Sequence, residues 1–369
     1  MNQAQSVAGR RRFLKTIAAA GAASFTAPAW AWNLQTTGKL KLGFDNFSIR
    51  AFNYKALQLI DYAASQNVDV LLLSDLDVYE SLEDDHLEAI RNQAEQAGIE
   101  LQVGTGSICP TSRSYNRERW GPAEDHARLL IHTAQRLGSS VARCYLGTRD
   151  DRDAPGGIYR HIEQTVDVLK AVRSRAEDAN VKIAVENHAG DMQAWELVEL
   201  IEAAGREFVG ATMDPGNATW TIEDPMLNLE LLGPYALTTG IRDSAVWESE
   251  GGAISMWTNM GRGSVDWPAY VKRFGELCPK TPFVLEIISY RWANESRYLE
   301  PQFWSRFPRA RAKEFARYVA LAKRGQPFEL PPNRPREGTG AELEQAQQKF
   351  DLEASLRYCR EELGLGLKS

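Results

Sequence analysis

Histidine and cysteine are scarce in this chain, whose 369 residues include 5 histidines and 4 cysteines. The cysteines lack the short spacings of a zinc site, so we expect buried free thiols rather than a zinc finger or a disulfide framework. They are Cys109, Cys144, Cys278 and Cys359. Positive charge is also in short supply, because the formal net charge is -6 at pH 7. An acidic chain has no basic field to attract phosphate backbones, which argues against nucleic acid as the partner.

A long hydrophobic run is missing as well. The apolar stretch near the N-terminus is too short to remain in a bilayer as a permanent anchor. It follows the basic segment Arg10 to Lys15 and precedes small-residue cleavage sites at Ala27 to Ala29 and Ala29 to Ala31. This leader resembles a twin-arginine export signal, so we predict that residues 1–31 are a signal peptide and that the mature protein is periplasmic. A basic amphipathic helix is the alternative interpretation.

The chain also lacks a Gly-x-Gly-x-x-Gly turn after its first apolar run, which argues against an open dinucleotide-binding sheet. What it does have is a 43% hydrophobic content and eight short apolar runs that alternate with amphipathic stretches. The runs are Leu40–Phe44, Val68–Leu73, Ile99–Val103, Val141–Tyr145, Ile183–Val185, Phe208–Met213, Leu237–Ile241 and Phe283–Ile287. Eight strand–helix units predict an α/β fold, a (β/α)8 TIM barrel, over residues 38–326.

The last part of the chain differs in composition from the predicted barrel. Residues 331–335 have the sequence Pro-Pro-Asn-Arg-Pro, which predicts a rigid linker, and residues 338–363 are polar and predict a helix. We therefore expect residues 327–369 to form a Pro-rich linker and a C-terminal helical extension. As an appendage, this helix could serve as a contact in a homo-oligomer.

Acidic side chains follow three of the predicted strands. Glu186 comes directly after Ile183–Val185, Asp214 after Phe208–Met213, and Glu286 lies at the end of the last run. In a TIM barrel the carboxyl ends of all strands meet at one face, so these carboxylates should lie close together. Neighbouring carboxylates repel each other unless a cation lies between them. The pattern therefore predicts a divalent metal site, with Mn²⁺ or Mg²⁺ favoured by the oxygen ligands and Zn²⁺ or Co²⁺ open if His188 contributes.

Three segments of the sequence carry a more specific resemblance. Ala184 to His188, Met213 to Asn217 and Leu285 to Ile287 resemble the metal-site strands of the xylose-isomerase-like sugar isomerase/epimerase family, and Gly261 to Trp267 resembles a recurring loop of that family. The similarity extends over about residues 40–325. It implies a metal-dependent enzyme in which Glu186, Asp214 and Glu286 bind the metal and a carbohydrate is the substrate.

Two positions depart from the family pattern. Where the seventh strand of the family usually supplies a metal-binding histidine shortly before a Lys-Asp or Arg-Asp pair, this chain has Gly240 before Arg242. Asn217 stands where sugar epimerases of the family often have a second histidine. Both departures leave the identity of the metal open.

The resemblance implies proton transfer beside a carbonyl group, with Glu186 and Glu286 as the catalytic acid and base. His188, Asn217 and Arg242 are the predicted substrate-binding residues. The sequence does not choose between isomerisation, epimerisation and elimination as the outcome. A sugar, keto-sugar or cyclitol is the expected substrate.

Two other functions are compatible with a barrel of this kind. Apurinic endonucleases need a histidine-rich site for several zinc ions, which 5 histidines and a net negative charge do not favour. The other alternative is a non-catalytic sugar-binding barrel that has lost a metal ligand, as suggested by Gly240.

Overall fold

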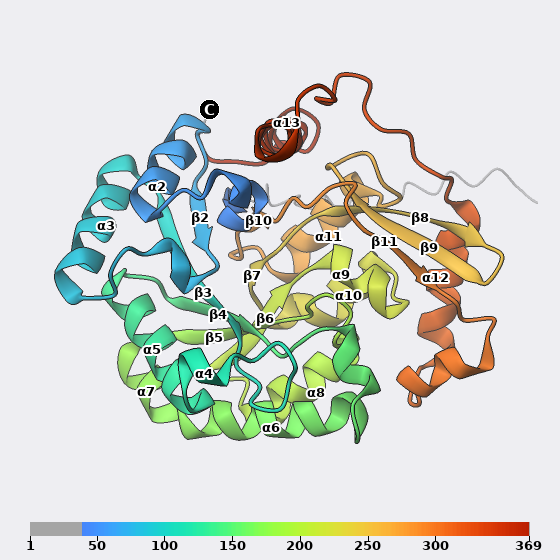
Figure 1. Cartoon of the computed structure of the whole chain (residues 1–369), viewed down its shortest axis with the longest axis horizontal. Helices are drawn as coiled ribbons and strands as arrows, with labels where there is room; N and C mark the ends of the chain where they lie inside the picture. Colours follow the sequence, from blue (N-terminus) through green and yellow to red (C-terminus); the bar gives the residue numbers. More distant parts are fainter. Residues whose placement is uncertain (1–38, 369) are drawn as a thin grey trace, which may run out of the picture. The chain divides into compact units, whose positions relative to one another are not determined.

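The computed structural model describes residues 39–368, so the predicted signal peptide lies outside the described residues. Eight parallel strands form the centre of the fold (Figure 1). Their order around the sheet is β10-β1-β2-β3-β4-β5-β6-β7. The strands are β1 (Leu42–Asp45), β2 (Val70–Leu73), β3 (Glu100–Ser107), β4 (Val141–Tyr145), β5 (Lys182–Glu186), β6 (Val209–Met213), β7 (Ala236–Thr239) and β10 (Phe283–Leu285). Each predicted apolar run contains or overlaps one of them.

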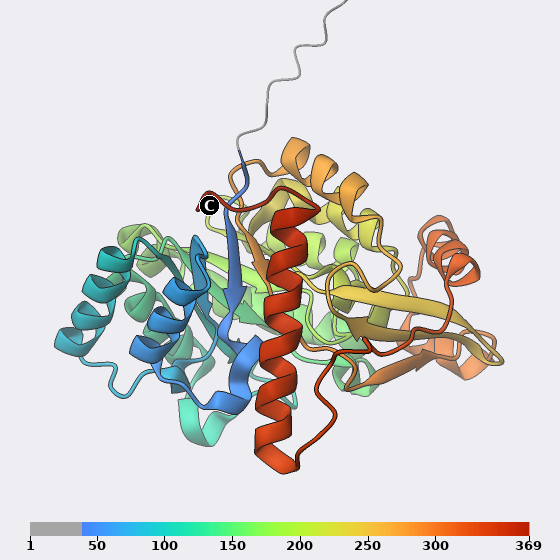
Figure 2. The ribbon, with the colours of Figure 1, turned by 90° about the horizontal axis from the view of Figure 1, so that it is seen from above.

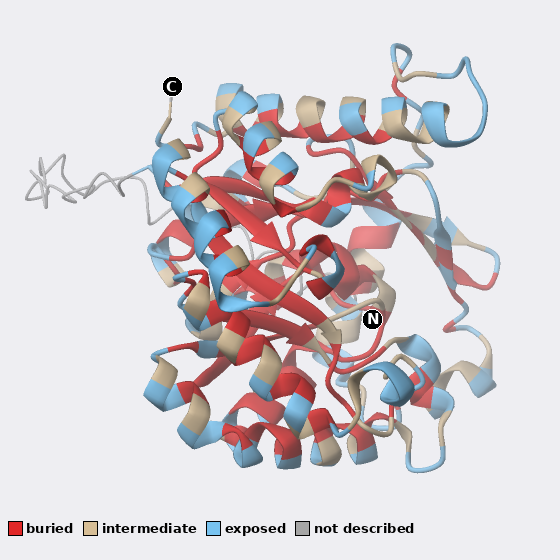
Figure 3. Cartoon of the chain, turned by 60° about the vertical axis from the view of Figure 1, so that its left-hand side comes forward, coloured by how far each residue is buried: buried red, intermediate tan, exposed pale blue. Residues whose placement is uncertain are grey.

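A single bridge brings the two edges of this sheet together. Ile241, just after β7, pairs in parallel with Leu285 of β10. The Ile241 N–H donates to the Val284 carbonyl at 2.7 Å, and the Glu286 N–H donates to the Ile241 carbonyl at 2.9 Å. This pairing confirms the predicted (β/α)8 TIM barrel. The strands are buried and carry the main hydrophobic core, as the red ribbon in Figure 3 shows.

Amphipathic helices surround the strands and alternate with them along the chain. Helix α5, for example, has acidic residues in its first turn and a buried apolar face, which suits both the helix dipole and the barrel wall. Helix α3 ends at Gly98, whose φ of 63° favours glycine. The helices of the first seven units are α2 (Ala56–Ser65), α3 (Asp84–Ala97), α5 (Ala123–Arg136), α6 (Gly157–Ala171) with α7 (Arg173–Ala179), α8 (Ala194–Ala204), α10 (Pro225–Leu232) and α11 (Trp267–Leu277).

The C-terminal helix α13 (Gly340–Glu361) provides the eighth helix of this outer layer. It lies between α2 and α11 (Figures 1 and 2). Its Glu353 accepts a hydrogen bond from Tyr62 of α2 at 3.4 Å, and its Ser355 accepts one from the Met260 N–H at 3.2 Å. Its apolar side chains join the main core, namely Leu352, Leu356 and Cys359. The predicted C-terminal helix is therefore present, but it packs as part of the barrel and differs in this from the expected appendage.

A small antiparallel sheet beside the barrel was not anticipated from the sequence. It has the order β11-β9-β8 and consists of β8 (Asp243–Ser249), β9 (Gly252–Thr258) and β11 (Ala293–Ser296). Helix α12 (Ala312–Arg324) packs against it, and the two share a second hydrophobic cluster that includes Val246, Tyr298 and Tyr318. The chain thus leaves the barrel after β7 and again after β10 to build this module next to the barrel mouth.

Within residues 39–368, no helix combines the length and the apolar character needed to cross a membrane.

Candidate metal and active site

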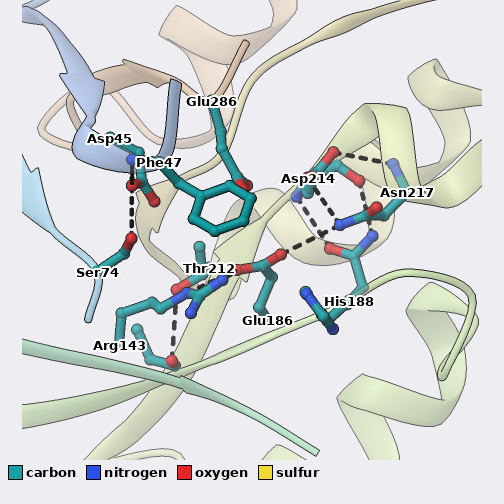
Figure 4. Close-up of polar contacts among 12 residues, drawn as sticks. Asp45, Phe47, Ser74, Arg143, Glu186, His188, Thr212, Asp214, Asn217 and Glu286 are labelled. Carbon is teal, nitrogen blue, oxygen red and sulfur yellow. Dashed lines mark hydrogen bonds and ion pairs between the residues drawn. The ribbon is translucent and has the colours of Figure 1, made fainter. Parts of the chain in front are cut away.

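The three predicted carboxylates converge at the mouth of the barrel (Figure 4). Glu186 is the last residue of β5, Asp214 follows β6, and Glu286 follows β10. All three are buried, and one oxygen of each lies within 4.8 Å of an oxygen of the other two. The strand-end rule therefore placed these residues correctly, because parallel barrel strands bring their carboxyl ends to one face.

The local fold holds Asp214 rigidly. Its side chain caps the short helix α9 (Pro215–Ala218) by accepting a hydrogen bond from the Asn217 N–H at 2.9 Å. Its main chain is held by Asn187, whose side chain accepts from the Asp214 N–H at 2.9 Å and donates to the Asp214 carbonyl at 2.7 Å. Contacts of its side chain and of its main chain therefore fix the direction in which the Asp214 carboxylate points.

Asn217 connects two of the carboxylates. Its Nδ2 donates to Asp214 Oδ2 at 2.7 Å and to Glu186 Oε1 at 3.1 Å. Its Oδ1 is buried and has no hydrogen-bond partner in the described part of the chain. A buried amide oxygen without a partner is costly, which is a reason to expect a donor or a cation beside it.

Two arginines bring positive charge into the site. Arg143 of β4 donates from Nε to Glu186 Oε2 at 2.7 Å and from Nη1 to the Thr105 carbonyl at 3.0 Å. Arg242 forms ion pairs with both Asp214, at 2.5 Å, and Glu286. The predicted substrate-binding Arg242 therefore contacts two of the candidate metal ligands directly.

A fourth carboxylate, Asp45 at the end of β1, was missed by the sequence analysis. It is buried and accepts hydrogen bonds from the Ser74 hydroxyl at 2.5 Å and from the Phe47 N–H at 2.8 Å. The signal was available, because Asp45 directly follows the apolar run Leu40–Phe44. The rule that selected Glu186 would have selected it as well.

The electrostatics of the site favour an added cation. Burial raises the pKa of Asp214 to about 8, with the charges of Glu186 and Glu286 acting in the same direction and Arg242 opposing them. Burial and then the charge of Glu286 raise the pKa of Asp45 to about 7. When ionised, the four carboxylates exceed the two guanidinium groups by two negative charges. A divalent cation would balance this excess, and the oxygen-only set of ligands suits Mg²⁺ or Mn²⁺.

Glycines on two sides of the site control what fits there. A β-carbon at Gly240 would lie 3.2 Å from Glu286 Oε2 and 3.5 Å from Asp214 Oδ2, so position 240 faces the carboxylates. A β-carbon at Gly216 would lie 2.2 Å from Cγ of Arg242. Gly216 therefore makes room for the arginine, while Gly240 leaves space beside the carboxylates at the position where the sequence resemblance leads us to expect a histidine.

His188 lies beside the carboxylates but not among them. Its ring stacks on Tyr145 with centroids 3.8 Å apart, and its Nδ1 lies 2.7 Å from the Gly147 carbonyl. Burial and the charge of Arg143 lower the pKa of His188 to about 4, so the ring is neutral at pH 7. A neutral ring beside a carbonyl carries its proton on Nδ1, which leaves Nε2 free to accept a hydrogen bond. The sequence could not tell whether His188 contacts metal or substrate, and the structure places it outside the carboxylate cluster.

A row of tryptophans flanks the site, and one of them positions Arg242. Trp257 of β9 stacks on Trp220 with centroids 4.2 Å apart, and it contacts the exposed Trp292 edge to face at 6.2 Å. The Arg242 guanidinium lies 4.4 Å from the centre of the Trp257 ring. Trp257 is fixed in turn by its indole N–H, which donates to the Gly216 carbonyl at 3.0 Å. The unpredicted sheet thus supports the site.

The fold and the site define a class of proteins, namely TIM barrels with buried carboxylates at the carboxyl ends of their strands. Comparison with known families shows which family of this class the chain belongs to. The model of the xylose isomerase-like TIM barrel family matches residues 49–306. The chain belongs to this family, as the sequence motifs predicted.

Individual relatives are distant. The chain is 21% identical to 3-oxo-isoapionate decarboxylase of Pectobacterium atrosepticum over 213 residues, which cover 57% of this chain and 70% of the relative. The crystal structure of a D-psicose 3-epimerase in the presence of D-fructose superposes with a TM-score of 0.57 at 14% identity, covering 88% of this chain and 100% of the epimerase. A family member from Mycobacterium smegmatis in complex with magnesium gives a TM-score of 0.51 at 14% identity, covering 78% and 98%. The two structures share the fold with this chain.

Proposed function

We propose that this protein is a divalent-metal-dependent enzyme that acts on a sugar, keto-sugar or cyclitol by proton transfer beside a carbonyl group. The observation that carries the proposal is the cluster of Glu186, Asp214 and Glu286, with oxygens within 4.8 Å of one another. Mg²⁺ or Mn²⁺ suits these ligands best. The magnesium complex of the Mycobacterium smegmatis relative supports this choice of metal.

In this proposal the role of each side chain follows from its position in the site. A bound divalent cation would polarise the carbonyl and hydroxyl oxygens of the substrate. Glu186 and Glu286 extend from β5 and β10, on different sides of the site, so one can take a proton from carbon and the other can return one. Asp214 would hold the cation together with oxygens of Glu186 and Glu286. Asn217, Arg242 and the free Nε2 of His188 orient substrate oxygens.

Decarboxylation is a second candidate reaction, because one relative is a 3-oxo-isoapionate decarboxylase. Loss of carbon dioxide from a 3-oxo acid leaves negative charge on a carbon beside a carbonyl, just as proton removal does. The same electrophilic site would stabilise both. Arg143 and Arg242 are both paired with carboxylates, so binding of an acidic substrate would depend on the positive charge of the bound cation.

Solvent hydrogen exchange tests the proposed function directly. Protein loaded with Mn²⁺ or Mg²⁺ would be incubated in D₂O with a panel of ketoses, inososes, 3-keto-glycosides and 3-oxo sugar acids. We expect deuterium incorporation or carbon dioxide release with at least one of them, and its loss in both Glu186→Gln and Glu286→Gln. Tight binding of a sugar by folded, metal-loaded protein without exchange or product would instead favour the non-catalytic sugar-binding barrel.

We also propose that the enzyme works in the periplasm. The support is the leader sequence, with its basic segment Arg10 to Lys15 and small-residue cleavage sites. A periplasmic location favours a substrate without a phosphate group, since phosphorylated sugars are typical of the cytoplasm.

A further inference from the structure

A cavity of about 280 Å³ opens next to the segment that follows Glu286. It lies between η1 (Asn46–Phe52), which follows β1, the segment that follows β10, and the N-terminal half of α13. Three arginines line it, Arg50, Arg291 and Arg334. Three like charges in one small cavity repel each other, so other groups must compensate them.

The acidic residues of the cavity compensate these arginines incompletely. Asp351 is engaged by Arg334, with Nε 3.1 Å from Oδ1 and Nη2 2.9 Å from Oδ2. Arg50 and Arg291 share the remaining carboxylate, Glu344, whose Oε1 lies 2.6 Å from Arg291 Nη1 and 3.8 Å from Arg50 Nη2. Three guanidinium groups thus face two carboxylates, which leaves one positive charge. Consistent with this, burial and then the charge of Arg291 lower the pKa of Arg50.

The wall of the cavity contains a polar group that the protein itself does not satisfy. Ser289 is 9% exposed, and its hydroxyl is buried without a hydrogen-bond partner among the described residues. The next residue, Tyr290, has a φ of 61°, a backbone conformation that is strained for a tyrosine. Unsatisfied hydroxyls and strained backbone are features of ligand sites.

The cavity borders the segment that leads out of the proposed catalytic centre. The wall residues Ile287 to Ser289 directly follow Glu286. On the other side, the Arg50 guanidinium lies 4.6 Å from the centre of the Phe47 ring, and the charge of Glu286 partly offsets the lowering of the Arg50 pKa. The two walls are joined by Ser48, which accepts a hydrogen bond from the Ile287 N–H at 2.9 Å. The first wall residue, Ile287, is thus the chain neighbour of Glu286, which places the cavity beside the proposed catalytic centre.

We propose that this cavity is the subsite for the carboxylate of an acidic carbohydrate, which Arg50 and Arg291 bind together with the Ser289 hydroxyl. The proposal rests on the proposed function and narrows its substrate to a sugar acid. One uncompensated positive charge matches one carboxylate, whereas a phosphate would bring excess negative charge beside Glu344. Glu344 stays beside the two arginines and competes with the carboxylate of the substrate for their N–H donors.

The proposed subsite predicts that replacing Arg50 or Arg291 lowers the affinity for D-gluconate and that replacing Glu344 raises it. The probes are D-gluconate and, as a neutral compound with the same carbon chain, D-glucitol, with Kd measured by calorimetry or ligand-observed NMR. Arg50→Gln and Arg291→Gln should each weaken D-gluconate binding about tenfold or more, the loss of one charge-assisted hydrogen bond. Glu344→Gln should tighten it, because the competing carboxylate is gone. D-glucitol binding should be unchanged in all three.

Controls separate this role from a structural one. Arg273→Gln removes an exposed arginine of α11 that pairs with Glu276, and it should leave D-gluconate binding unchanged. If Arg50→Gln lowers the melting temperature, Arg50→Lys tests the subsite in its place, because lysine keeps the positive charge. If Glu344 only ties α13 to the barrel, Glu344→Gln lowers the melting temperature without tightening D-gluconate binding, which overturns the proposal. Equal affinity for D-gluconate and D-glucitol, or equal competition by inorganic phosphate, overturns it too.

Failure of the proposed function gives different results from failure of the proposed subsite. Arg50 and Arg291 contact none of the three carboxylates of the metal cluster, so their effect on D-gluconate binding can be measured in metal-free protein. Metal content reports on Glu186, Asp214 and Glu286 without a contribution from Arg50 or Arg291. Loss of exchange with retained, Arg50-dependent binding of D-gluconate would reject the catalytic proposal and keep the subsite.

Discussion

Gly240 faces the carboxylate of Glu286, and a β-carbon at position 240 would lie 3.2 Å from Glu286 Oε2. A side chain at position 240, where the sequence resemblance leads us to expect a histidine, would therefore point toward the carboxylates. In the proposed metal site, the residue at position 240 bears on metal affinity.

Replacing Gly240 by histidine should restore a fourth ligand. An imidazole is a borderline ligand, so Gly240→His should raise the affinity for Zn²⁺ or Co²⁺ more than that for Mg²⁺. The contact of 3.2 Å requires Glu286 to shift by a few tenths of an ångström, which Gly240→Ala would test without adding a ligand. Titration with each metal measures the affinities. A folded Gly240→His variant with the Zn²⁺ affinity of Gly240→Ala would show that the imidazole does not reach the metal.

Asp214→Asn should remove most of the bound divalent metal. The amide keeps the size of the side chain but loses the charge that a hard cation needs. Metal content after dialysis against Mn²⁺ measures the effect. Asp224→Asn is the matched control, because Asp224 also caps a helix, accepting from the Met226 and Leu227 N–H groups at 2.8 and 3.0 Å. Equal metal content in the two variants would rule out Asp214 as a ligand.

Arg242→Gln should destabilise the metal-free protein and make its stability more dependent on metal. Removing one partner of a buried ion pair costs about 3 to 5 kcal/mol, because Asp214 and Glu286 lose their counter-ion. Added Mn²⁺ should recover part of this loss, and melting curves with and without Mn²⁺ measure it. Arg152→Gln breaks another buried pair, with Glu196, and should lose stability without recovery by Mn²⁺. Equal metal responses in both variants would contradict the proposed site.

Glu223 should make stability fall as the pH rises. Its carboxyl group accepts the Ala194 N–H at the start of α8, and burial raises its pKa to about 8 from an ordinary value of 4.5. Between these values the unfolded chain releases a proton that the folded protein retains, so rising pH favours unfolding. The contribution is complete below pH 4.5 and is lost through pH 8. Glu223→Gln stays neutral, and its melting temperature relative to the parent should rise from pH 5 to pH 8. Parallel melting temperatures over this range would contradict the shift.

Export should depend on the arginine pair of the leader. Replacing Arg10 and Arg11 by lysine should leave most of the precursor in the cytoplasm, because the export pathway recognises the two arginines. Fractionation of the native host with an antibody against the mature protein measures the distribution. Unchanged export of the double variant, with the parent chain as reference, would show that this leader is not a twin-arginine signal.

The sequence by itself determined the barrel and the three carboxylates. Buried parallel strands are continuous apolar runs, and the residue after each run lies at the barrel mouth, so periodicity and position locate Glu186, Asp214 and Glu286 without further information. The same rule locates Asp45 in retrospect. The resemblance to the family also singled out Gly240, where a histidine is expected.

Only the tertiary structure decided what surrounds these carboxylates. Arg242 meets Asp214 and Glu286 because Gly216 leaves space for its side chain and Trp257 supports its guanidinium, and Trp257 belongs to a sheet whose strands β9 and β11 are far apart in sequence. The polar C-terminal helix carries few apolar residues, so its place in the barrel wall was not visible from periodicity. Contacts of this kind depend on the packing of distant segments, which local sequence patterns do not encode.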